Sequence, residues 1–209
     1  MTMKKSKTLI MLVAFAATMS LLLSFNNTEK KAGTSAKLDQ MVSDWERAKA
    51  YTQEYLSAST DEAVNFKPTP EMRTFGQQML HLAEANYMLG ASATGKTSPI
   101  DWGALEKSDQ HKTKATVTKA VMDSYDFVIA GAKEMNEQKL GEMVKVFNFD
   151  MSREVALSKV FEHQTHHRGQ ATQYLRAQGL TPPQESRRYR SRRRRTATGK
   201  LWGNFRNTP

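Results

Sequence analysis

Apolar residues recur at three- and four-residue steps through most of the chain between residues 38 and 178. This is the periodicity of an amphipathic helix, whose apolar stripe packs against a neighbouring element. Four segments show it, and we expect helices over residues 38–58, 70–90, 114–136 and 152–178. The pattern therefore predicts an all-α protein, built as a four-helix bundle with one or two long connections.

Signals at the helix ends sharpen two of these boundaries. Thr69 is suited to cap a helix whose first residue is Pro70, so the second helix is expected to start near residue 70. Ser152 can cap the fourth helix, which is expected to end at Gly179, before Pro182 and Pro183.

The connections are read from their composition. Residues 57–70 are expected to form a turn, and residues 91–112, rich in Gly, Ser, Thr, Pro and Asp, form a long loop between the second and third helices. Residues 140–150 are ambiguous, because the segment 144–149 is compatible with either an extended or an irregular structure.

The N-terminal segment, residues 1–36, has the order of a secretory signal. Lys4, Lys5 and Lys7 precede an uncharged apolar stretch over residues 8–25, and a polar segment follows. A cleaved signal peptide is favoured over an uncleaved membrane anchor, although the apolar stretch just reaches the length that spans a bilayer. The protein is therefore expected to be exported, either periplasmic or membrane-anchored, and to contact a membrane only through an uncleaved segment.

The C-terminal segment, residues 186–209, carries eight Arg and one Lys without an acidic residue. Such a segment cannot form a core, and we expect a disordered tail. The two terminal segments carry more positive charge than the chain's net charge of +10, because the domain expected over residues 37–185 is net negative. The high net charge therefore says little about that domain. Nucleic-acid binding has only the charge of the tail in its favour, and a solvated tail is the preferred interpretation.

The chain contains no cysteine. Disulfides, cysteine-ligated zinc and thiol nucleophiles are therefore excluded.

Three of the five histidines fall within five residues, at His163, His166 and His167. His163 and His167 are four residues apart, so on a helix their Cβ atoms lie about 5–6 Å from each other on one face. Both take positions on the apolar stripe of the fourth helix, where core residues are expected. Two imidazoles so placed can share a metal ion and leave coordination positions open, but spacing alone also allows surface or core histidines.

A third candidate ligand, His81, lies on the second expected helix but off its apolar stripe. It can join the pair only if that helix packs against neighbours on two sides.

Three segments resemble the DinB/YfiT-like family. They are Asn65-Phe-Lys-Pro-Thr-Pro70, Arg73-Thr-Phe-Gly-Gln-Gln-Met-Leu-His-Leu-Ala83, and His163-Gln-Thr-His-His-Arg-Gly-Gln-Ala-Thr-Gln-Tyr-Leu-Arg176 with Gln178-Gly-Leu-Thr-Pro-Pro183 after it. The resemblance covers about residues 38–183. It implies an up-down-down-up four-helix bundle in which His81, His163 and His167 hold a divalent metal ion, usually zinc or nickel. It also implies that homodimers are common.

The resemblance implies two enzymatic classes that act on small molecules: metal-dependent hydrolysis, and transfer of a small-molecule thiol onto an electrophile. Export would separate the protein from cytosolic thiols, which favours hydrolysis or a reaction that the sequence does not identify. A stress-related bundle that binds metal without turnover is the third alternative.

No catalytic side chain is identified from the sequence. Gln164 stands where a His-Glu-x-x-His metalloprotease has its general base, so that class is disfavoured. Glu84 is expected to orient a ligand or to be solvated, and neither His166 nor His111 is expected to bind the metal.

Overall fold

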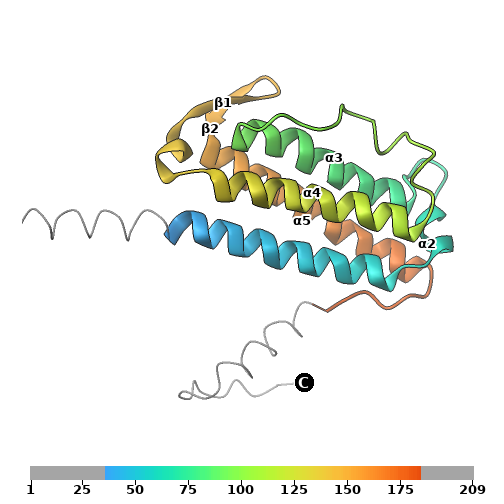
Figure 1. Ribbon diagram of the computed structural model, residues 1–209. Coiled ribbons are helices and arrows are strands. Elements are labelled where there is room, and N and C mark those ends of the chain that lie inside the picture. The colour runs from blue at the N-terminus through green and yellow to red at the C-terminus, as the bar shows by residue number, and fades with distance from the viewer. Residues whose placement is uncertain (1–35, 185–209) are drawn as a thin grey trace, which may run out of the picture.

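The structure is a computed structural model that describes residues 36–184, and its long helices pack side by side as a bundle (Figure 1). The chain is helical from residue 36 to residue 58 and then forms the long helices α3 (Phe75–Thr94), α4 (Lys114–Glu134) and α5 (Arg153–Ala177). The expected all-α four-helix bundle is confirmed. The tail predicted for residues 186–209 lies outside the described residues, as does the signal segment predicted for residues 1–36 except for residue 36 itself.

Short elements fill two of the connections. A single helical turn, α2 (Asp61–Asn65), lies within the expected turn before α3. A 3₁₀ helix (Glu137–Gly141) and a hairpin of β1 (Met143–Val146) and β2 (Phe149–Ser152) join α4 to α5. Between residues 36 and 184, no helix combines the length and apolar character that crossing a membrane requires.

The direction of the chain in Figure 1 gives the topology of the bundle. The helix of residues 36–58 and α5 run one way, whereas α3 and α4 run the other way. Two successive helices can share a direction because the connection of residues 95–113 returns along the length of the bundle. The four long helices thus follow an up-down-down-up order.

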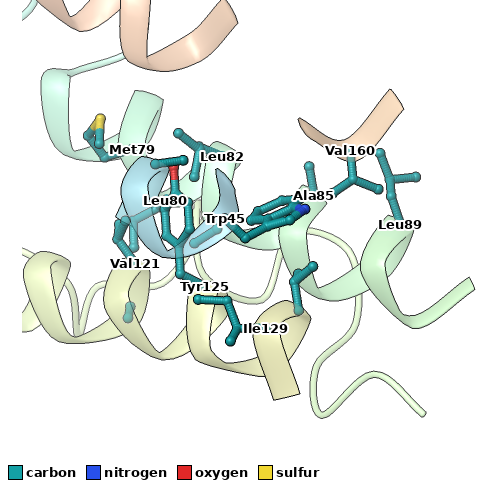
Figure 2. Packing of buried hydrophobic residues seen from close by; sticks show 14 of the residues in the cluster. Trp45, Met79, Leu80, Leu82, Ala85, Leu89, Val121, Tyr125, Ile129 and Val160 are labelled. Carbon is teal, nitrogen blue, oxygen red and sulfur yellow. The ribbon is translucent and has the colours of Figure 1, made fainter. Parts of the chain in front are cut away.

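One core unites the four long helices. Figure 2 shows Trp45 of the first helix, Leu82 of α3, Tyr125 of α4 and Val160 of α5 in a common cluster. The rings of Trp45 and Tyr125 form a T-shaped pair with 5.7 Å between centroids, an arrangement that aromatic pairs prefer.

Helix α3 packs against α4 on one side and α5 on another, so most of its circumference is buried. His81 could join the histidine pair only if this helix packed on two sides, and α3 does so. A residue off the main apolar stripe of α3 therefore still faces a neighbouring helix. The close packing of α3 on α4 uses glycine: a Cβ atom at Gly90 would lie 2.8 Å from Val128, and one at Gly131 would lie 2.8 Å from Thr94.

The predicted start of the second helix was wrong. Helix α3 begins at Phe75, because Thr74 and Gln77 form a capping box in which each side chain accepts the other's backbone N–H. Pro70 instead lies in a turn closed by the Met72 N–H on the carbonyl of Thr69. The helix also continues past Gly90 to Thr94 and ends at Gly95, which adopts a left-handed conformation with φ of 78°.

The other boundaries agree with the sequence. Thr113 caps α4 and Ser152 caps α5. Of the two alternatives for residues 140–150, the extended one is correct from Met143 onward, and the hairpin turns at Phe147 with φ of 53°.

Candidate metal centre

Three histidines meet between α3 and α5. One ring nitrogen from each of His81, His163 and His167 lies within 4.8 Å of the others. The Nε2 atoms of His163 and His167 are 3.1 Å apart, and the ring of His81 lies 4.7 Å from that of His167 between centroids. The structure therefore brings together the three residues predicted as ligands, although they lie up to 86 positions apart in the sequence.

The nitrogen geometry fits a divalent ion. A tetrahedral zinc ion with bonds of about 2.0–2.1 Å holds neighbouring ligand nitrogens about 3.3 Å apart. The separation of 3.1 Å between the two Nε2 atoms is close to that value. The Nδ1 atom of His163 is buried and has no hydrogen-bond partner among the described residues. No hydrogen bond at Nδ1 therefore prevents this nitrogen from carrying the proton, which leaves the Nε2 lone pair free for a metal ion.

Both α5 histidines are held in the neutral form that binds metal. Burial, which is the largest cause, and the nearby His81 and His166 together lower the pKa of His163 to about 4. Burial lowers the pKa of His167 to about 3, with contributions from the neighbouring His163 and His81. Near neutral pH, protons therefore compete only weakly with a metal ion for these two histidines.

Sequence reasoning missed two charged residues beside His81. Glu106 lies in the connection between α3 and α4, and its Oε2 atom is 3.1 Å from the His81 Nδ1 atom. Arg73 donates from Nε to the Glu106 Oε1 atom at 2.6 Å. No pattern in the loop marks Glu106, because only the path of the connection brings it to α3.

Glu84 differs from the solvated alternative expected for it. Its side chain is buried on α3, and its two oxygens accept the backbone N–H groups of Gly103, Leu105 and Glu106 at 3.1, 2.7 and 2.7 Å. Glu84 thus fixes the loop segment that carries Glu106.

Two amide side chains contact the α5 side of the site. The Gln78 Nε2 atom lies 2.7 Å from the His167 Nδ1 atom, and Gln78 also contacts Gln170. A metal ion at His167 Nε2 would require the proton of this ring on Nδ1, and therefore a Gln78 amide rotated so that its oxygen accepts there. Gln78 follows Thr74 by one helical turn, so the capping box that starts α3 also places this amide.

A buried polar network sets the rotation of α5. The Tyr125 hydroxyl donates to Gln164 Oε1 at 2.7 Å, and the Arg168 guanidinium donates to the same oxygen at 2.6 Å. Gln164 and Arg168 follow His163 and His167 by one residue, about 100° round the helix. Because the core holds Gln164 and Arg168, the two histidines are turned toward α3. Gln164 faces Tyr125, which adds a structural reason against metalloprotease chemistry.

The remaining two histidines are not part of this group of three. His166 is exposed, and its ring lies 5.0 Å from that of His167 between centroids. His111 lies in the loop before α4.

A polar cleft of about 740 Å³ opens beside His167. It is lined by side chains of α3, α5 and the connections before and after α3: Glu71, Met72, Arg73, Gln78, Glu106, His166, His167, Gln170, Gln173 and Tyr174. Of the three clustered histidines, His167 is the one that lines this cleft.

Comparison with known proteins agrees with this architecture. Residues 31–194 match the DinB family. The chain is 28% identical over 152 residues to the uncharacterized protein YrdA of Bacillus subtilis strain 168, covering 70% of this chain and 86% of YrdA.

Two crystal structures show the same fold. A DinB-like protein from Bacillus cereus ATCC 10987 superposes with a TM-score of 0.57 at 23% identity, covering 70% of this chain and 95% of that one. The DinB-like protein YjoA from Bacillus subtilis gives a TM-score of 0.56 at 16% identity, covering 69% and 96%.

Proposed function

The chain belongs to the DinB family, and we propose that it is an exported metal-dependent hydrolase whose divalent ion is bound by His81, His163 and His167. Zinc and nickel are the preferred ions, because both accept imidazole ligands. The observation that carries the proposal is the convergence of three ring nitrogens within 4.8 Å, two of them on residues with strongly lowered pKa values.

Three neutral ligands favour catalysis over a structural role. Structural zinc sites are closed by four protein ligands, whereas catalytic sites keep a position open. When bound, such an ion lowers the pKa of water and polarises a carbonyl group. The cleft beside His167 reaches the site from outside and provides space for a substrate.

The residues of the cleft suit a small polar substrate. Gln78, Gln170 and Gln173 offer amide donors and acceptors, and Arg73 is paired with Glu106. Burial raises the pKa of the Tyr174 phenol, so this group keeps its proton and can donate a hydrogen bond to a substrate oxygen. These residues would bind and orient a molecule rich in hydroxyl, amide or carbonyl groups.

The experiment is an activity screen of protein reconstituted with zinc or nickel. Activated esters and amides test hydrolysis, and electrophiles supplied with a small thiol test transfer. We expect metal-dependent ester or amide cleavage that His167→Ala abolishes and His166→Ala retains. Turnover only in the presence of a thiol would establish the transferase alternative, and absence of turnover with every substrate would favour the non-catalytic bundle.

A further inference from the structure

We propose that Glu106 is a positioning residue for His81, and that the buried Glu84 carboxylate holds Glu106 in place by binding the backbone of its loop. The inference rests on the proposed metal site, and it assigns a role to the long connection between α3 and α4. That connection would then complete the site as well as join two helices.

The first step is the contact between Glu106 and His81. The Glu106 Oε2 atom lies 3.1 Å from His81 Nδ1, within hydrogen-bonding distance. A carboxylate can only accept, so the contact requires the proton of a neutral His81 to be on Nδ1. The lone pair is then on Nε2, and the ring orientation is fixed, as is common for histidines that bind metals.

The second step concerns Arg73, which competes for the same nitrogen. One Arg73 amino group lies 3.4 Å from His81 Nδ1, and a guanidinium can only donate. Donation to Nδ1 would leave the proton of His81 on Nε2 and block that nitrogen as a ligand. Glu106 prevents this outcome by binding Arg73 at 2.6 Å and by offering the shorter contact to His81.

The third step explains why Glu106 stays at this position. Glu84 is 1% exposed, and its two side-chain oxygens accept hydrogen bonds from three backbone N–H groups of one loop segment, those of Gly103, Leu105 and Glu106. Glu84 follows His81 by three residues on α3. The same helix turn therefore carries both the ligand and the group that aligns the loop with it.

Glu84 is better suited to this role than to direct coordination. An oxygen from Glu84 and one from Glu106 lie within 4.8 Å of a His81 nitrogen, so the distances alone would permit a mixed site. However, both oxygens of Glu84 are already bound to backbone N–H groups, and three partly buried donors would lose their acceptor if it turned away.

The test measures zinc affinity of the full chain by competition with a chelator. Glu106→Gln should weaken zinc binding roughly 10–100-fold, the usual effect of losing a group that orients a ligand. Glu71→Gln is the matched control, because Glu71 lines the same cleft, is exposed, and carries the same charge. We expect its affinity to stay within about threefold of the wild-type value, since exposed charges are well screened.

Combining the Glu84 and Glu106 substitutions distinguishes a shared positioning role from a nonspecific loss of structure. Glu84→Gln should weaken zinc binding, and the double variant with Glu106→Gln should bind no more weakly than Glu106→Gln alone, because both act through one contact. Independent, multiplicative losses would overturn the proposed path. An unchanged affinity in Glu106→Gln would overturn the proposal by itself, even if the Glu84 variant failed to fold.

Cobalt substitution tests whether Glu106 acts through His81. The visible spectrum of the cobalt-loaded protein should keep its shape in Glu106→Gln, because the ligands remain the same. A changed coordination number would show that Glu106 is itself a ligand and would overturn its role as a positioning residue. If the wild type binds neither ion, the proposed function fails; if the wild type binds zinc and Glu106→Gln binds it equally well, only this inference fails.

Discussion

His163 and His167 interrupt an otherwise apolar stripe of α5, and the polar groups that surround them make the interruption tolerable. His167 contacts Gln78, and His163 contacts His167. Buried polar groups without such partners cost about 1–3 kcal/mol each. The Nδ1 atom of His163, which has no hydrogen-bond partner among the described residues, therefore marks a local cost in stability.

At the residue scale, the metal-free protein should lose stability in mild acid. The folded pKa values of about 4 for His163 and about 3 for His167 lie below the unfolded value of about 6.5. The unfolded chain therefore binds more protons, and stability falls as pH drops from about 6.5 toward 3. Urea titrations of chelator-treated protein check this, and the slope against pH should flatten in His167→Gln. If His167→Gln had the same slope as the wild type, the loss of stability in acid could not be assigned to His167.

The hydroxyl of Tyr125 gives a second prediction at this scale. It contacts Thr52 at 2.7 Å and donates to Gln164 at 2.7 Å in the core. Burial also raises the pKa of this phenol to about 12. Tyr125→Phe leaves Thr52 without this partner and should cost about 1–3 kcal/mol of unfolding free energy.

Tyr174→Phe is the matched control, because the Tyr174 hydroxyl makes no hydrogen bond to the described part of the chain while its ring is buried. It should change the unfolding free energy by less than about 0.5 kcal/mol. Equal losses in the two variants would show that the hydroxyl network contributes nothing specific.

The site was only partly predictable from these residues. The spacing of His163 and His167 marks one face of a helix, and the resemblance supplied His81. Glu106 and Arg73 are 33 residues apart, and no local pattern links them. For Glu84, the sequence left open whether it orients a ligand or is solvated, because the sequence does not show that a loop would cover it.

At the scale of elements, two helical glycines should respond oppositely to alanine. Alanine normally stabilises a helix by about 1 kcal/mol relative to glycine. A Cβ at Gly131 would lie 2.8 Å from the Thr94 Cβ, close to the backbone of α3, whereas nothing lies within 4 Å of a Cβ at Gly169. Gly131→Ala should therefore destabilise by about 1–3 kcal/mol despite the propensity gain.

Gly169→Ala should stabilise the protein by roughly 0.5–1 kcal/mol, because that position on α5 is exposed and the added methyl group meets open space. Chemical denaturation of both variants measures the difference. Stabilisation by Gly131→Ala would mean that α3 and α4 do not approach as closely as described.

Element boundaries show where local signals compete. Thr69-Pro70 and Thr74 both carry helix-start signals, and Thr74 prevails because Gln77 completes its capping box. Gly90 looked like a helix end, yet the helix passes through it because the missing side chain lets Val128 pack there. The extension of α3 beyond Gly90 thus depends on tertiary packing, which the sequence pattern does not show.

For the whole molecule, the bundle was the most predictable feature, because each long helix carries a sustained apolar periodicity. The sequence could not predict which side of α3 packs against α5, because α3 is apolar over much of its circumference. The location of His81 beside the α5 pair depends on that choice, and it follows from packing on two neighbours rather than one. The homodimer implied by the resemblance stays a prediction.

Export is the prediction that concerns the complete chain. Lys4, Lys5 and Lys7 followed by the apolar residues 8–25 should direct the protein out of the cytosol. Cell fractionation with a C-terminal tag should find a shortened chain outside the cytosol. Full-length protein attached to the membrane would support the anchor alternative, and full-length protein free in the cytosol would disprove export.

The most direct measurement is the divalent-metal content of purified protein and of its histidine variants, determined by elemental analysis after loading with zinc and removal of excess ion. The wild type should hold one ion per chain, His163→Ala and His167→Ala none, and His81→Ala strongly reduced amounts, because each variant removes one of three converging nitrogens. His166→Ala and His111→Ala should retain the ion. A wild type without bound metal, or loss of metal in His166→Ala with retention in His167→Ala, would contradict the account.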